Sequence, residues 1–154
     1  MRTASRIAVT LLFAIWWGGF TFYAAVVVPT GQRVLGSATA QGFVTQPVSN
    51  WINIIGAVVI AGSCWNMVSA RRNASLPVRR ALVISWAVLA IAEVVLVVLH
   101  PRIDAMLDTT TRSIAVDRSV FYAMHRGYLL VATAQWLAAT VHAVAVGYAW
   151  SRTD

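Results

Sequence analysis

The chain has 154 residues, of which 59% are hydrophobic and only 11% are charged. Soluble domains carry about 25% charged residues, so this composition excludes an ordinary soluble domain and indicates an integral membrane protein. The net charge is +7, and every basic residue is an arginine. Because the arginines lie at the ends of apolar runs, without a basic face interleaved with aromatic residues, we expect a lipid bilayer and no nucleic acid as partner.

Four apolar runs predict an all-α fold, a single-domain membrane-spanning four-helix bundle over residues 1–154 with up-down-up-down topology. Helices of about 20 residues are long enough to cross the ~30 Å hydrocarbon layer. The predicted helices cover residues 7–28, 50–70, 81–99 and 119–150. We expect Pro29 to end the first helix and Pro101 to end the third. Residues 30–48 have the loose spacing of a short surface helix, and Ser49 is the expected N-cap of the second span.

The distribution of arginine predicts the orientation in the membrane. Residues 71–80, RRNASLPVRR, form a short loop with four arginines, and such loops stay cytoplasmic. If four helices cross, the same side receives Arg2, Arg6 and Arg152. The other loops mix arginine with aspartate at positions 104, 108 and 117. We therefore expect a multi-pass protein of the inner (plasma) membrane with both termini in the cytoplasm.

Ionisable residues gather around the predicted third and fourth helices. Glu93 lies inside the third apolar run, His100 lies at its end, and His125 lies in the first turns of the fourth. Glu93 and His100 are two helical turns apart, so they project from one face with ~10 Å of axial separation. We expect both imidazoles at similar depth near the outer surface. His142 lies ~25 Å farther along the fourth helix than His125, near the inner surface, and its role stays open.

An acid in the membrane costs ~2.5 kcal/mol or more, so Glu93 should face the bundle interior and be protonated or paired. Four residues are candidate partners for its carboxyl group: Asn50, Asn53, Arg126 and Gln135.

The first interpretation of this polar cluster is a cofactor site. His100 and His125 would ligate haem b or a metal such as copper, since neutral imidazole binds haem iron, copper and zinc. Two arginines would neutralise haem propionates, and two methionines would offer a thioether to Cu(I). These residues are Arg102, Arg126, Met106 and Met124.

Two other interpretations stay open. Glu93, His100 and Arg126 would form a path for protons or a small solute. Alternatively the cluster is structural, and the chain is a non-catalytic accessory subunit that binds other proteins or a second copy of itself. Hydrolase, nucleotide-binding and zinc-protease motifs are absent from the sequence, so an enzyme is not favoured. Cys64 is the single cysteine, which excludes a cysteine-based metal cluster.

Two segments resemble a known family of small membrane proteins. They are residues 16–43, WWGGFTFYAAVVVPTGQRVLGSATAQGF, and residues 121–130, FYAMHRGYLL. The first has a glycine-rich helix, then VVVP ending at Pro29, then RVL at residues 33–35. These features are similar to the family of domain of unknown function 4149, which includes proteins like transmembrane protein 205.

The resemblance implies a four-helix membrane protein without an established activity. The family also looks distantly similar to the copper-resistance protein D superfamily, some members of which bind haem or handle copper. By this analogy of fold alone, the resemblance favours a cofactor at His100 and His125.

Overall fold

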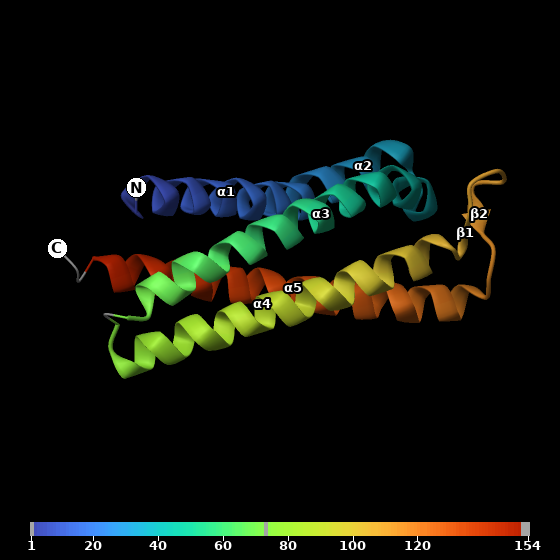
Figure 1. The fold of residues 1–154 in the computed structure, drawn as a ribbon. Helices are drawn as coiled ribbons and strands as arrows, with labels where there is room; N and C mark the ends of the chain where they lie inside the picture. The colour runs from blue at the N-terminus through green and yellow to red at the C-terminus, as the bar shows by residue number, and fades with distance from the viewer. Residues whose placement is uncertain (1, 73, 152–154) are drawn as a thin grey trace.

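A computed structural model of the chain describes residues 2–72 and 74–151 and has four long helices that run alternately up and down (Figure 1). The helices are α1 (Arg2–Phe22), the π-helix η1 (Tyr23–Val27), α2 (Val28–Leu35), α3 (Ala38–Ala70), α4 (Leu76–Asp104) and α5 (Arg118–Trp150). The start of α1 and the end of α5 lie at the same end of the bundle as the α3–α4 loop, which we call the arginine end. The all-α, up-down-up-down prediction is confirmed; Arg152 lies outside the described residues.

Four helical segments of the described chain are long and apolar enough to cross a membrane. They are Ala4–Leu35, Ala38–Ala70, Leu76–Asp104 and Arg118–Trp150. Large apolar side chains cover the outside of the bundle, where Ile15 is 70% and Leu130 is 72% exposed. In lipid such a surface is favourable, and the helices satisfy their own backbone hydrogen bonds. The chain is an integral, multi-pass membrane protein.

We predicted that the first span ends at Pro29, and the structure shows that it does not. It passes through η1, continues as α2 with a proline in its first turn, and stops at Gly36, whose φ of 62° is left-handed. In η1 the N–H of Val28 bonds to the carbonyl of Tyr23, one residue farther back than in an α-helix. The shifted hydrogen bonds come directly before Pro29, which has no N–H to donate to the helix.

The second span also differs from the prediction. There is no separate surface helix over residues 30–48, because α3 begins at Ala38 and runs through Pro47. Its N-cap is Ser37, whose Oγ accepts a hydrogen bond of 3.2 Å from the N–H of Ala40. Ser49, the predicted N-cap, lies inside α3, and its hydroxyl pairs with that of Tyr23 at 3.1 Å.

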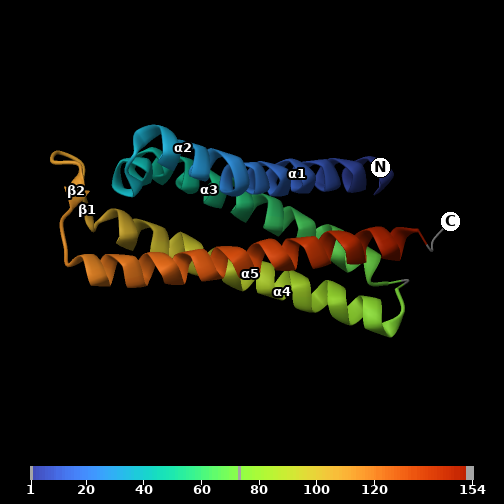
Figure 2. The same cartoon turned by 180° about the vertical axis from the view of Figure 1, so that it is seen from behind.

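The third span continues one turn beyond Pro101 to Asp104, so the predicted end at Pro101 is wrong. In that extra turn, Ile103 is buried in the bundle. A short antiparallel hairpin follows, made of β1 (Leu107–Asp108) and β2 (Ser113–Ile114). It marks the other end of the molecule, which we call the hairpin end (Figure 2). The last helix, α5, starts at Arg118, one residue before the predicted position.

Helices α4 and α5 form the most extensive helix pair, α3 packs on α4, and α1 packs mainly on α3. Two apolar clusters fill the interior. The central one contains Phe13, Trp16, Val59, Ile60, Leu89, Ala138 and Ala139. The second, near the arginine end, contains Met67, Ala70, Leu82, Ala145, Val146 and Ala149. Polar side chains are buried among and above these clusters, and they define the candidate site.

Candidate functional site

Glu93 projects from α4 into the bundle, where it is only 5% exposed. Its Oε2 accepts a hydrogen bond of 2.6 Å from Nε2 of Gln135 on α5. Among the described residues, its Oε1 has no hydrogen-bond partner. The structure therefore selects Gln135 from the four candidate partners and leaves one carboxyl oxygen buried and unsatisfied, which is costly in a low-dielectric interior.

Helix α3 approaches Glu93 through a glycine. A Cβ added at Gly56 would lie 2.9 Å from Oε2 of Glu93 and 2.9 Å from Nε1 of Trp16. The Trp16 indole comes from α1 and donates a hydrogen bond of 3.1 Å to the carbonyl oxygen of Ile52. Helices α1, α3, α4 and α5 thus meet around one carboxyl group. The absence of a side chain at Gly56 leaves space for the Glu93 carboxyl group and the Trp16 indole.

Asn53 and Tyr128 form the next polar pair toward the hairpin end. Nδ2 of Asn53 donates to the Tyr128 hydroxyl at 3.2 Å, and that hydroxyl lies 3.3 Å from Oδ1 of the same amide. Tyr128 is two helical turns before Gln135 on α5, so both face the interior. The pair joins α3 to α5. Its hydrogen bonds satisfy the Asn53 amide and the Tyr128 hydroxyl, which would have no partners in lipid.

His100 lies one level farther toward the hairpin end, buried at 7% exposure. Its Nε2 donates to the carbonyl oxygen of Gln46 at 3.2 Å, and its Nδ1 lies 3.0 Å from Oδ2 of Asp104. Both ring nitrogens thus face hydrogen-bond acceptors. A neutral imidazole has one N–H, so the two contacts together require one further proton, shared between Nδ1 of His100 and the Asp104 carboxyl group.

These residues form a row of three hydrogen-bonded pairs along the inner faces of three helices, which we call the polar file. Its members are Asp104, His100, Tyr128, Asn53, Glu93 and Gln135. From Asp104 to Glu93 the file extends ~16 Å along α4. The rings of His100 and Tyr128 meet edge to face, with centroids 6.1 Å apart. Within the described residues, no direct hydrogen bond joins Tyr128 to His100 or to Glu93.

A small cavity lies beside the file and brings the two predicted histidines together. Its volume is about 70 Å³. It is lined by Gly42, Thr45, Gln46, Ser49, His100, Ile103, Asp104, Leu107, Phe121, His125 and Tyr128. His125 stacks on Phe121, with ring centroids 5.9 Å apart and planes at 4°. A water molecule needs about 10–15 Å³ of such volume, so the cavity has room for several.

The cofactor interpretation does not fit this cavity. Ligand pockets for cofactors usually measure about 300–1,000 Å³, several times the observed volume. No group of three or more metal-ligating His, Cys, Asp or Glu side chains occurs in the described part of the chain. The arginines proposed for propionates, Arg102 and Arg126, are exposed, and neither Met106 nor Met124 lines the cavity. The two histidines are neighbours, but the surroundings favour neither haem nor copper.

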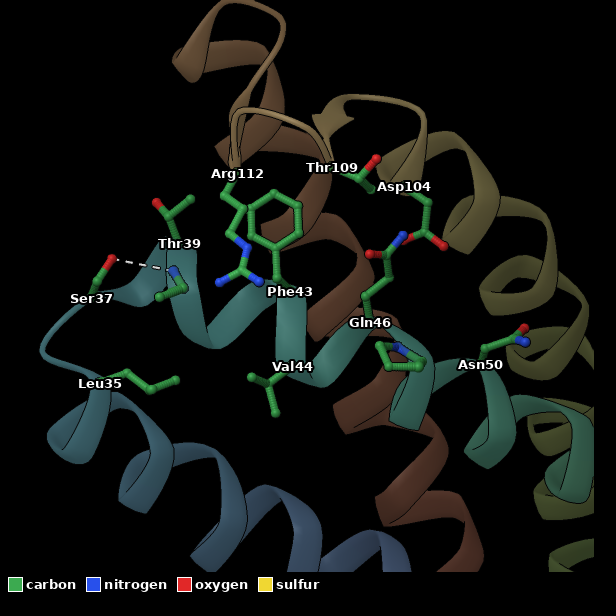
Figure 3. Close-up of a pocket in the computed structure, with 12 residues that line it drawn as sticks. Leu35, Ser37, Thr39, Phe43, Val44, Gln46, Asn50, Asp104, Thr109 and Arg112 are labelled. Atoms are coloured by element: carbon green, nitrogen blue, oxygen red, sulfur yellow. Dashed lines mark hydrogen bonds between the residues drawn. The ribbon is translucent and has the colours of Figure 1, made fainter.

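A larger vestibule opens above the cavity at the hairpin end. It has a volume of about 790 Å³ and shares Gln46 and Asp104 with the smaller cavity. Figure 3 shows the side chains of Gln46 and Asp104 directed toward one another; Arg112 and Phe43 also line the vestibule. Asn50, predicted as a partner of Glu93, lines this vestibule instead. Asp104 therefore lies at the junction of the vestibule and the polar file.

The hairpin that carries Arg112 is held by an aspartate. Oδ1 of Asp108 accepts hydrogen bonds from the N–H groups of Thr110 and Thr111 at 2.8 and 3.2 Å, and Oδ2 accepts one from the Thr111 hydroxyl at 2.8 Å. These donors favour the carboxylate, so the Thr111 hydroxyl above all, then the two amides, lower the pKa of Asp108. The ordered turn gives Arg112 its left-handed φ of 51° and fixes where its side chain starts.

A second polar pair lies closer to the arginine end, where we expected His142. Nδ1 of His142 lies 3.1 Å from Oγ of Ser85, and in the described residues its Nε2 has no partner. Leu89 and Ala139, both 0% exposed, lie between this pair and the Glu93–Gln135 pair along α4 and α5. An apolar layer therefore separates the polar file from the arginine end.

A scan against models of protein families found no match, and neither curated proteins nor solved structures are significantly similar to this chain. The resemblance to the family of domain of unknown function 4149 therefore stays a prediction. The site has to be interpreted from its own geometry.

The site contains two residues that the sequence argument did not include. Asp104 was assigned to a loop, but α4 continues past Pro101 and places it one turn from His100. Tyr128 was not among the residues predicted for the site. The signal for Tyr128 was its spacing of two turns from Gln135, which puts both side chains on one face of α5.

Proposed function

We propose that this multi-pass plasma-membrane protein takes up protons at its hairpin end and binds them on Glu93 inside the bundle. The observation that carries the proposal is the buried carboxyl group, whose Oε1 has no partner in the described residues and whose Oε2 already accepts from Gln135. A proton on Oε1 neutralises the charge and leaves the bond to Gln135 intact. Intramembrane acids with such partners mark proton and ion pathways in membrane proteins.

The polar file offers a chemically reasonable route. A proton arriving in the vestibule meets the Asp104 carboxylate, which contacts Nδ1 of His100. His100 lines the 70 Å³ cavity, so after accepting a proton at Nδ1 it would release one by turning Nε2 from the Gln46 carbonyl to a water in that cavity. Tyr128 lines the same cavity, and the last step, from the Tyr128–Asn53 pair to Glu93, requires a motion of the bundle, since no hydrogen bond joins Tyr128 to Glu93 in the described residues.

The orientation belongs to the same proposal. Four arginines lie at the arginine end, two in the α3–α4 loop and two in the first turns of α4, so we infer that this end faces the cytoplasm and the hairpin end faces outward. Protons would then enter from the outer side. Among the interpretations of the sequence, we prefer proton transfer to haem or copper binding, because both ring nitrogens of His100 already face hydrogen-bond acceptors and the cavity beside it measures about 70 Å³.

The test is proton uptake after a rapid pH drop, with the protein in nanodiscs and a pH-sensitive dye in solution. Wild type should take up a proton with a matching carboxyl C=O band in the infrared spectrum, and Glu93→Gln should lose both. His100→Gln should keep the amplitude and slow the uptake. Asp117→Asn is the matched control, since Asn caps a helix as well as Asp, and it should change neither quantity.

Unchanged amplitude in Glu93→Gln would refute proton binding at Glu93, and an unchanged rate in His100→Gln would refute the route. A protein without uptake that co-purifies with a fixed partner would instead support the accessory-subunit interpretation.

A further inference from the structure

A separate pocket, lined by four arginines, lies at the arginine end, where α3 stops and α4 begins. Its volume is about 600 Å³, within the range of ligand pockets. It is lined by Arg71, Arg72, Leu76, Arg79, Arg80, Val83 and Ile84, and we call it the arginine pocket. The arginines form two adjacent pairs, one after α3 and one in the first turns of α4.

Among the described residues, no acidic side chain balances this charge. All four arginines are exposed, and no carboxylate lines the pocket. In the part of the chain that the structure describes, the single ion pair is His100 with Asp104, at the opposite end of the bundle. Four guanidinium groups in one pocket attract an anion, and their planar forks match phosphate oxygens.

The start of α4 adds to the positive potential. Leu76 is the first residue of this helix and lines the arginine pocket, so the positive end of the helix dipole lies at the site. The N-cap residue, Ser75, makes no side-chain hydrogen bond to the helix. An anion in the pocket would supply the negative charge that this helix start lacks.

The far wall of the pocket is apolar and leads into the membrane. Val83 and Ile84 are 38% and 61% exposed, one turn beyond Arg79 and Arg80 on the same face of α4. A soluble anion would use only the arginines. A phospholipid would use both features, because its headgroup lies at the helix end and its acyl chains run along the span.

We propose that the arginine pocket binds an anionic phospholipid whose headgroup carries two phosphates, one at each arginine pair, with its acyl chains against Val83 and Ile84. Basic pockets at the cytoplasmic ends of membrane helices are suited to such headgroups. The occupant is thus a lipid of the surrounding bilayer, and the inference does not depend on proton binding at Glu93.

The test is native mass spectrometry of the full chain from nanodiscs of phosphatidylcholine that contain cardiolipin, or phosphatidylglycerol at the same total charge. Wild type should retain cardiolipin, and phosphatidylglycerol should be retained much less. An arginine near an anionic surface contributes about fivefold in affinity, so Arg79→Gln/Arg80→Gln should weaken binding roughly 30-fold. Arg112→Gln/Arg118→Gln, at the hairpin end, removes the same charge and should leave binding unchanged.

Three results would overturn the proposal. Equal retention of both lipids at matched charge would mean diffuse attraction to an anionic surface. Equal loss in the two double variants would mean an effect of net charge alone. Displacement of cardiolipin by free pyrophosphate at comparable concentration would mean a soluble-anion site. Because all four substituted arginines, two at the pocket and two at the hairpin end, are exposed, circular dichroism should show unchanged helix content in every variant.

Discussion

The contact of α3 with Glu93 makes Gly56→Ala the most informative stability test. The added Cβ would lie 2.9 Å from Oε2 of Glu93, 2.9 Å from Nε1 of Trp16 and 3.2 Å from Cε2 of the same indole. Separations under 3.0 Å require a neighbour to move. Neither neighbour is free to do so, because Glu93 is bonded to Gln135 and the indole to the carbonyl of Ile52.

The expected magnitude follows from two opposing effects. Overpacking a buried site costs about 1–3 kcal/mol. Replacing glycine by alanine inside a helix returns about 1 kcal/mol of helix propensity. The net loss for Gly56→Ala should therefore be about 0–2 kcal/mol, too small to interpret without a control.

The same helix provides the control. A Cβ at Gly62 of α3 would meet nothing within 4 Å, so Gly62→Ala carries the propensity effect without the overpacking. Unfolding in mixed detergent micelles, followed by circular dichroism, should place the two variants about 1–3 kcal/mol apart, with Gly56→Ala the less stable. Equal stability within about 0.5 kcal/mol would refute the close approach of α3 to Glu93.

Two further predictions concern the pair at Glu93 and the hairpin. Gln135→Leu removes the hydrogen bond to Glu93 and should lower stability by about 1.5–3 kcal/mol, measured by the same unfolding assay. Thr133→Val, whose hydroxyl bonds only to the Leu129 carbonyl of its own helix, should change stability by less than about 0.5 kcal/mol; equal losses would contradict a specific bond. The pKa of Asp108 is lowered from 3.8 in the fold, so its stabilisation of the hairpin is complete above pH 3.8 and is lost as pH falls through the lowered value. Protection of the Thr110 and Thr111 amides, measured as the exchange rate relative to the intrinsic rate at each pH, should fall over that acidic range in wild type but not in Asp108→Asn, and constant protection in wild type would be the contrary result.

The fold could be predicted because a lipid bilayer permits few backbone conformations. A backbone in hydrocarbon must bond to itself, so each apolar run of sufficient length becomes a helix, and connected runs alternate in direction. The helix ends could not be predicted by rules from soluble proteins. Helix ends were predicted at Pro29 and Pro101, since proline in a helix costs about 3 kcal/mol. Ending the helix in an apolar layer would instead leave several N–H and C=O groups unpaired at several kcal/mol each, so the helices continue.

The sequence predicted which residues belong to the site better than it predicted which of them pair with one another. Glu93, Asn53 and Gln135 were expected in the interior because polar groups avoid lipid, and all three are buried. Their partners depend on how each helix is rotated about its own axis, which an apolar sequence hardly specifies. Arg126 shows the effect. It lies two residues before Tyr128, roughly 200° around α5, so the rotation that turns Tyr128 inward leaves Arg126 exposed.

The apolar layer beneath Glu93 constrains what a proton there can do. From Gln135 to His142, α5 covers ~10 Å, too far for a direct hydrogen bond. Leu89 and Ala139 are fully buried within that interval and offer no polar group to a water chain. If Glu93 binds a proton as proposed, the proton would return toward the hairpin end in this conformation. Passage to His142 requires a bundle motion that parts Leu89 from Ala139, so the static protein should bind protons from one side without leaking them to the other.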